Sequence, residues 1–198
     1  MKALIVNGSH RQNSESARVA RVLQDHFLPA HFTDIGLHDL GEMDLPFWDE
    51  GVWNGDPEWE FKLEKLRKDQ YEADALIFVC PEWNGMATPR LKNYFLLGDE
   101  GGLEDKPALI VAVSAGLGGA YVVSELRSSS YKNTKLCYIP DHLIIRDVSN
   151  MLTTAPLFSD DPIADRCRYS VGRLAVYAQA LSVVRVPLNE PRSYPYGM

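Results

Sequence analysis

Cysteine is scarce in this sequence and is not spaced for chemistry. Three cysteines occur in 198 residues, an odd number with no C-x-x-C pair. Disulfide-stapled domains carry an even number at close spacings, and zinc sites need paired Cys or His ligands. We therefore exclude both and expect the three cysteines to be small buried hydrophobic residues in a reducing cytoplasm.

Long hydrophobic runs are missing as well. The longest, residues 75–80 and 108–113, are far shorter than a membrane span, which needs about 20 apolar residues. The apolar stretch after Lys2 is only four residues long, too short for a secretory signal. The sequence thus predicts a cytoplasmic protein with no membrane partner.

Clusters of basic residues are also absent. The net charge is −7, and nine acidic residues but no Lys or Arg lie between Asp34 and Glu60. This distribution lacks the positive patch that nucleic-acid binding requires. The same stretch holds Trp48, Trp53 and Trp59. We interpret residues 36–57 as an acidic aromatic loop, either a solvated loop pinned by its aromatic rings or a lid or subunit contact.

Strand and helix signals alternate along the chain. Apolar runs predict strands at 3–6, 31–35, 75–80, 108–113 and 143–145, and helices are expected to begin near residues 14, 57, 89, 120 and 162. Nearly continuous apolar strands are typical of a parallel sheet buried on both faces. No repeat or linker divides the chain, so we expect one doubly wound α/β domain over residues 1–198, with an irregular tail at 187–198. Ligands of such sheets bind at the carboxyl ends of the strands.

Residues 8–16, after the first strand, contain the donors that an oxyanion needs. They offer helix N-terminal amides, a forked guanidinium and hydroxyl groups, from Ser9, Arg11, Ser14 and Ser16. The loop has neither the Walker pattern nor G-x-G-x-x-G, so a single terminal phosphate suits it better than a triphosphate or a dinucleotide. The alternative is an ordinary capped turn.

Two further loops follow buried strands. The first joins exposed backbone groups to an aromatic ring and a carboxamide, which together suit the edge of a flat heterocycle; it comprises Pro81, Glu82, Trp83, Asn84 and Gly85. The second begins with Ser114, Ala115 and Gly116 and is rich in glycine, which lets a planar ring approach the backbone closely. For residues 81–85, the alternative is a turn in which Trp83 is simply packed.

Other polar residues give weaker signals. His10, His26, His31, His38 and His142 lack metal-ligand spacing, so we expect no metal and interpret them as surface or capping residues. Lys92 is expected to be a solvated charge rather than a catalytic base.

Taken together, the three loops resemble those of the NAD(P)H-dependent FMN reductases, flavodoxin-like enzymes that include quinone, azo-dye and chromate reductases. Gly8, Ser9, Arg11 and Ser14 match the family pattern G-S-x-R-x-x-S. Residues 73–84 are similar to A-D-x-hydrophobic-P-E-Y-N, with Trp83 in place of Tyr, and residues 91–93 match L-K-N. Residues 114–127 resemble S-x-G-x-x-G-G…L-R.

This resemblance implies a flavodoxin-like, five-stranded sheet with helices on both faces and one noncovalent FMN. It implies that Ser9, Arg11, Ser14 and Ser16 hold the phosphate, and that residues 81–85 and 114–116 flank the isoalloxazine. The implied activity is ping-pong transfer of hydride from NADPH or NADH, through FMN, to a flavin, quinone or related small acceptor. Because flavin N5 carries that chemistry, we assign no catalytic side chain. The family also implies a homodimer or homotetramer.

Two other interpretations stay open. A flavodoxin-like electron carrier would serve a protein partner without NAD(P)H activity, although such carriers use a T-x-T-G-x-T loop with no counterpart of Arg11. An assembly module with the acidic loop as its docking surface is the third. We also predict that Trp48 or Trp53 lies in a subunit contact or over a flavin.

Overall fold

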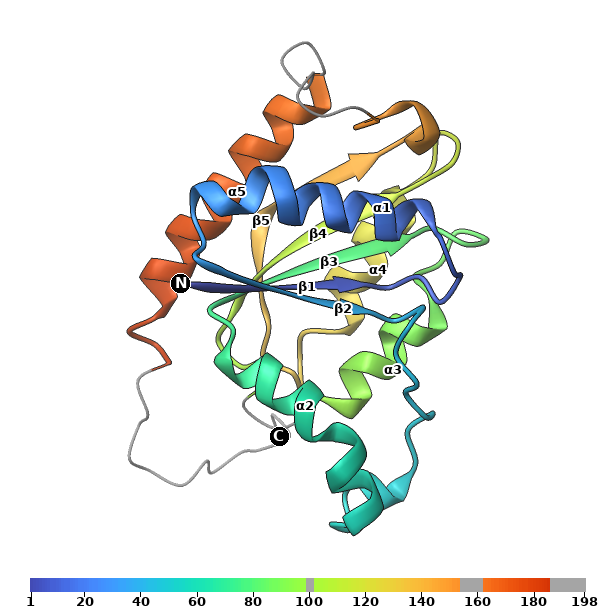
Figure 1. The fold of residues 1–198 in the computed structure, drawn as a ribbon, viewed down its shortest axis with the longest axis vertical. Coiled ribbons are helices and arrows are strands. Elements are labelled where there is room, and N and C mark those ends of the chain that lie inside the picture. Colours follow the sequence, from blue (N-terminus) through green and yellow to red (C-terminus); the bar gives the residue numbers. More distant parts are fainter. Residues whose placement is uncertain (99–101, 154–161, 186–198) are drawn as a thin grey trace.

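The computed structural model describes residues 1–98, 102–153 and 162–185. Its centre is a five-stranded, all-parallel sheet in the order β2-β1-β3-β4-β5, seen in Figure 1. The strands are β1 (Lys2–Asn7), β2 (Asp34–Asp39), β3 (Ala75–Pro81), β4 (Pro107–Val113) and β5 (Cys137–Ile145). The doubly wound, flavodoxin-like class predicted from the sequence is confirmed.

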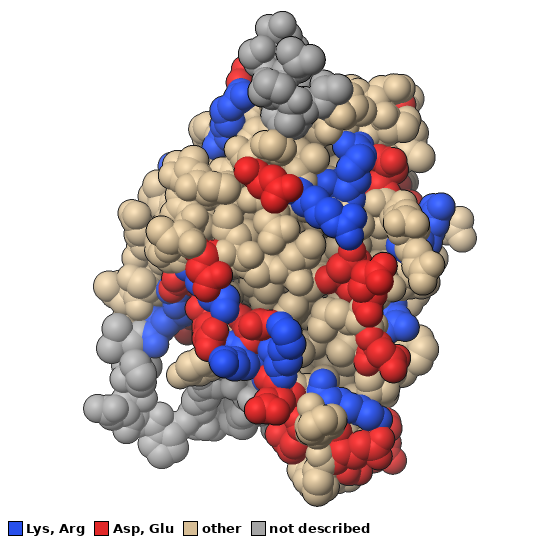
Figure 2. Space-filling model, in the orientation of Figure 1, with Lys and Arg blue, Asp and Glu red and all other residues tan. Residues whose placement is uncertain are grey.

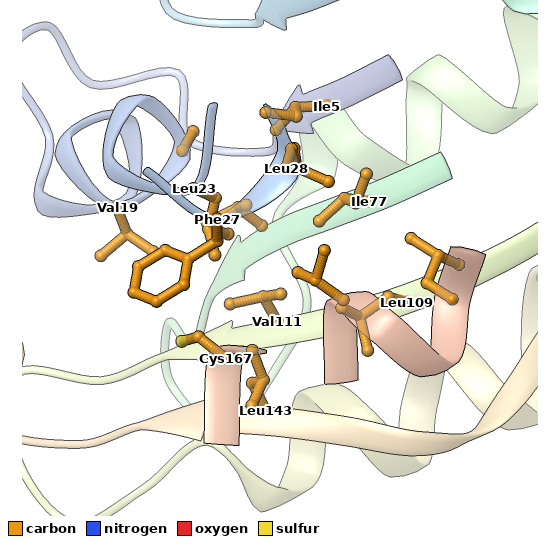
Figure 3. Close-up of a cluster of buried hydrophobic side chains, with 14 of the residues drawn as sticks. Ile5, Val19, Leu23, Phe27, Leu28, Ile77, Leu109, Val111, Leu143 and Cys167 are labelled. Carbon is orange, nitrogen blue, oxygen red and sulfur yellow. The ribbon is translucent and has the colours of Figure 1, made fainter. Parts of the chain in front are cut away.

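Helices cover both faces of this sheet. One face carries α1 (Glu15–Val22) and α5 (Pro162–Leu181), and the other carries α2 (Pro57–Glu72), α3 (Pro89–Leu97) and α4 (Ala120–Ser129). Alternation along β1 serves both layers, because Ile5 packs toward α1 and α5 while Leu4 and Val6 pack toward the other helices. Figure 3 shows Ile5 and Ile77 meeting side chains of the α1 and α5 layer.

The helix starts follow local sequence signals. Ser14 is the N-cap of α1, and its hydroxyl accepts a hydrogen bond from the Ala17 amide at 3.1 Å. Asp56 caps α2 in the same way, with Pro57 in the first turn. After α1 the chain widens into a π-helical turn (Leu23–Phe27) and then tightens into a 3₁₀ turn (Leu28–Ala30) before it enters β2.

Two strands differ clearly from the sequence prediction. β2 lies at Asp34–Asp39 rather than 31–35, so residues 36–39 of the expected acidic loop belong to this edge strand. Polar residues interrupt the apolar ones in β2, and of its six residues only His38 is buried, so the hydrophobic pattern that predicts a strand is weak here. β5 begins at Cys137, well before the predicted 143; of its first four residues only Ile139 is fully buried and Pro140 is exposed, so the apolar signal there is weak. The predicted N-cap Asp161 and the tail 187–198 lie outside the described residues.

Burial corrects two expectations about side chains. Cys80 and Cys167 are buried, as predicted, but Cys137 is half-exposed at the start of the edge strand β5. His38 was expected at the surface and is instead buried, between the Tyr94 hydroxyl and the Asp69 carboxylate, each 2.9 Å from a ring nitrogen. Within the described ranges, no helix meets the length and hydrophobicity of a membrane span, and no group of His, Cys, Asp and Glu forms a metal-binding cluster.

Candidate active site

The three sequence-predicted loops emerge from neighbouring strands. β1 pairs with β3, and β3 pairs with β4, all parallel, so the segments that follow them meet at one edge of the sheet. The chain order reverses between β1 and β3, because β1 is followed by β2 on one side and β3 lies on the other. Such a switch point is where doubly wound sheets bind their ligands.

The first loop, residues 8–16, is held against β3 and the start of α3 by its backbone. The Gly8 amide donates to the Val79 carbonyl at 2.8 Å, and the Thr88 hydroxyl donates to the Gly8 carbonyl at 2.5 Å. The hydroxyl of buried Ser9 accepts from the Arg11 amide at 3.3 Å, which leaves its own hydrogen free to donate. These contacts anchor the loop while its polar groups stay available.

The other predicted phosphate ligands lie around the start of α1. Ser14 and Ser16 are buried, whereas Arg11 is exposed and forms no salt bridge with the described side chains. The first-turn amides of Glu15 and Ser16 have no carbonyl one turn earlier to bond. Loop and helix end therefore bring together hydroxyls, amides and a guanidinium, a donor set for an oxyanion.

The helices that follow the other two loops have anionic side chains at or just before their starts already. A carboxylate oxygen of Glu82 accepts from the Gly119 and Tyr121 amides at the start of α4. Just before α3, whose N-cap is Thr88, the Ala87 amide donates to Glu125 at 2.7 Å, and Pro89 has no amide hydrogen to offer. In the described structure a carboxylate therefore occupies the N-terminus of α4, whereas none accepts from the first-turn amides of α1.

The second loop, residues 81–85, forms a tight hairpin at the end of β3. Trp83 and Met86 exchange two backbone hydrogen bonds, at 3.0 and 2.9 Å. Asn84 and Gly85 between them have φ angles of +50° and +74°, which matches the Asn-Gly preference of a type I′ turn. The Trp83 ring meets His10 edge-on, with 4.7 Å between ring centroids. This contact joins the hairpin to the first loop, and His10 had no sequence signal for it.

The third loop, which begins with Ser114, Ala115 and Gly116, lies beside the hairpin. The Ser114 hydroxyl accepts from the Gly116 amide at 3.2 Å, and Ala115 and Gly116 are exposed. A methyl group at Gly116 would meet no atom within 4 Å, so open space adjoins this backbone. Pro81, by contrast, is a buried residue of β3 itself.

Lys92 and Glu125 form an ion pair between α3 and α4. Burial raises the pKa of Glu125, but hydrogen bonds from Lys92 and the Ala87 amide outweigh it and leave the pKa below its usual value. Lys92 is thus a paired charge rather than the purely solvated one expected. The sequence offered no signal for Glu125, because its contacts come from residues 33 to 38 positions earlier.

The acidic aromatic segment packs along α3. The Trp48 amide donates to Asn93 Oδ1 and Asn93 Nδ2 donates to the Pro46 carbonyl, both at 2.8 Å. Trp48 is half-buried and meets Trp53, which is 70% exposed, with 4.6 Å between rings. Figure 2 shows acidic side chains gathered at the end of the molecule where α2 begins. The predicted burial of Trp48 or Trp53 in a subunit contact or over a flavin stays a prediction.

A doubly wound sheet with an open oxyanion loop at its switch point defines a protein of the flavodoxin-like class that binds a phosphorylated ligand. Residues 1–149 match the model of the NADPH-dependent FMN reductase family. The chain belongs to this family. It is therefore an FMN-dependent NAD(P)H oxidoreductase, with FMN as cofactor and NAD(P)H as electron donor.

Individual relatives agree with this assignment. An FMN-dependent NADPH-azoreductase of Staphylococcus aureus is 30% identical over 128 residues, which cover 64% of this chain and 68% of the relative. Two solved structures share the fold. A flavoenzyme NAD(P)H:acceptor oxidoreductase from Paracoccus denitrificans superposes with a TM-score of 0.65 at 20% identity, covering 92% of this chain and 97% of that one. An NADH:FMN oxidoreductase gives 0.64 at 19% identity, covering 88% of each chain.

Proposed function

We propose that the phosphate of FMN binds at the first loop and the start of α1, held by Ser9, Arg11, Ser14 and Ser16. The donor set fits this group: a guanidinium for charge, hydroxyls with a hydrogen to donate, and first-turn amides aimed outward. The observation that carries the proposal is the selective occupation of helix ends. The Glu82 carboxylate occupies the start of α4, and the first-turn amides of α1 are left for the ligand's anion.

We further propose that the isoalloxazine lies between the hairpin and the third loop. Residues Pro81, Glu82, Trp83, Asn84 and Gly85 form one side of this slot, and Ser114, Ala115 and Gly116 form the other. The outward groups of the Asn84-Gly85 turn suit the polar edge of the ring. The exposed Gly116 backbone gives the ring a close approach without a side chain in the way.

Bound FMN supplies the redox chemistry, accepting hydride from NADPH or NADH and passing electrons to the acceptor. The chain's residues bind and orient it. Met86, Leu117 and Tyr121, large side chains exposed on or beside the two loops, offer apolar contact to a nicotinamide or a flat acceptor. We propose that donor and acceptor use this place in turn, which makes the reaction ping-pong and suits quinones, flavins or azo compounds.

Steady-state kinetics test this function. FMN-loaded protein should oxidise NADPH or NADH when a quinone is present, and initial rates measured while both substrates are varied should give parallel double-reciprocal lines. Intersecting lines would contradict ping-pong exchange. Failure to bleach the flavin with either nicotinamide would favour the electron-carrier alternative, which serves a protein partner.

We also propose that the protein acts in the cytoplasm as a homodimer or homotetramer. Three cysteines, an odd number without C-x-x-C spacing, are what a protein of a reducing compartment typically has. The exposed aromatic side chains of the acidic segment, Phe47 and Trp53, supply apolar surface for a subunit contact. Light scattering on the purified protein measures the assembly directly.

A further inference from the structure

The hairpin 82–87 is joined to α4 at both of its ends, by two carboxylates that run in opposite directions. At its start, Oε2 of Glu82 reaches across and accepts hydrogen bonds from the amides of Gly119, at 2.8 Å, and Tyr121, at 3.1 Å. At its end, Oε2 of Glu125, which projects from α4, accepts from the Ala87 amide at 2.7 Å. We name this pair, Glu82 and Glu125, the carboxylate clamp.

Electrostatics favours both halves of the clamp. The negative charge of Glu82 lies at the N-terminus of α4, where the helix dipole and unpaired amides stabilise an anion. The second oxygen of Glu125 pairs with Lys92 of α3, and its lowered pKa keeps it ionised. Both carboxylates therefore accept charge-assisted hydrogen bonds from backbone amides, which are stronger than neutral ones.

Steric packing around Glu82 is close. A Cβ added at Gly118 would lie 2.5 Å from Glu82 Oε1, well inside contact distance. Gly119 has a φ of +103°, and a Cβ there would lie 2.5 Å from Ile144 Cγ2. The Gly118-Gly119 pair thus lets the third loop approach the hairpin as closely as the clamp requires.

We propose that Glu82 and Glu125 are positioning residues that set the width of the slot between the hairpin and the third loop. This inference rests on the proposed function, which places the flavin ring in that slot. Through the clamp, the hairpin's backbone groups keep a fixed distance from the Ser114–Gly116 backbone. Glu82 also fills the anion site at the start of α4, which directs phosphate to the start of α1.

Binding of two flavins tests the proposal. Riboflavin has the ring of FMN without its phosphate, so a slot of the wrong width should weaken both ligands equally. We expect Glu82→Ala to raise the Kd of FMN and of riboflavin by the same factor, about tenfold, measured by fluorescence titration of the apoprotein. Glu82→Gln keeps one acceptor oxygen and should recover most of the affinity. Ser124→Ala, an exposed change on α4, is the matched control and should change neither Kd.

A second measurement tests the packing without any flavin. Gly118→Ala should lower the thermal stability of the apoprotein in the wild-type background, because its methyl group displaces Glu82. In the Glu82→Ala background the same change should cost much less, since the carboxylate is gone. Equal costs in both backgrounds would overturn the contact on which the clamp depends.

The outcomes separate this proposal from the proposed function. If the wild-type protein binds FMN with its visible band perturbed, but Glu82→Ala lowers only the melting temperature and leaves both Kd values unchanged, the clamp has no role in flavin binding. If the wild-type protein binds neither flavin, the proposed function itself is wrong, and the Gly118 measurement still decides whether the contact exists.

Discussion

Removing the guanidinium of Arg11 is the sharpest test of the phosphate site. Arg11 is exposed on the first loop and forms no salt bridge with the described side chains, so Arg11→Ala should leave the fold intact. A charge-assisted hydrogen bond to phosphate is worth about 1.5–3 kcal/mol, and exposure to solvent reduces that value. Because about 1.4 kcal/mol is tenfold in affinity, we expect FMN binding to weaken by about 10- to 100-fold.

The remaining donors explain why binding should weaken rather than vanish. The Ser9 and Ser14 hydroxyls and the first-turn amides of α1 stay in place when Arg11 is removed. They still offer neutral hydrogen bonds, which contribute about 0.5–1.5 kcal/mol each. Arg11→Lys keeps the charge but loses the forked geometry, so its effect should fall between the wild type and Arg11→Ala.

Fluorescence titration of the apoprotein with FMN and with riboflavin gives the required contrast. Riboflavin lacks the phosphate, so its affinity should change little in Arg11→Ala. Arg173→Ala, an exposed change on α5, serves as the control for loss of positive charge. Equal weakening of both flavins, or unchanged FMN binding, would refute Arg11 as the phosphate ligand.

Three other predictions concern stability and assembly. Burial, aided by the charge of Arg185, lowers the pKa of Lys106 from 10.5 to about 7. Between these two pH values the unfolded chain binds more protons than the folded one, so stability should increase with pH. The midpoint of urea unfolding should therefore rise from pH 7 to 9.5, and it should rise less in Lys106→Met. Burial also lowers the pKa of His38, so the free energy of unfolding should fall as the pH drops below 6.5. Tyr94→Phe removes the hydroxyl that hydrogen-bonds the His38 ring, and this should cost about 1–3 kcal/mol in urea unfolding. Trp53→Ser should keep the melting temperature but reduce the assembled mass in light scattering, and an unchanged mass would rule out this segment as the subunit contact.

Local signals explain how much of the fold could be predicted. β3 and β4 are buried along their whole length, so their continuous apolar runs were enough to place them. The caps Ser14 and Asp56 act on amides two or three residues away, within the reach of a sequence motif. The edge strand β2 has only one fully buried residue, His38. Its sequence therefore resembled a polar segment, and both its position and the burial of His38 were missed.

The residues of the candidate site likewise differ in how far apart in the sequence their contacts lie. The oxyanion donors could be predicted because they lie within nine consecutive residues, 8–16. The contacts of Glu82 and Glu125 could not, because each spans 33 to 39 residues and exists only once β3 and β4 are paired. A lone glutamate after a strand looks the same in sequence whether it faces solvent or caps a distant helix.

The distribution of acidic residues at the helix starts links these two halves of the site. Three helix N-termini lie near one sheet edge, and each by its dipole attracts an anion. If all three were open, a phosphorylated ligand would have competing places to bind. Glu82 fills the one at α4 with the protein's own carboxylate, Pro89 leaves the start of α3 one amide donor short, and Arg11 adds positive charge near the start of α1. We therefore infer that Glu82, which holds the hairpin to α4, also directs the phosphate of FMN to the start of α1, so that position and orientation of the cofactor follow from one arrangement of charges.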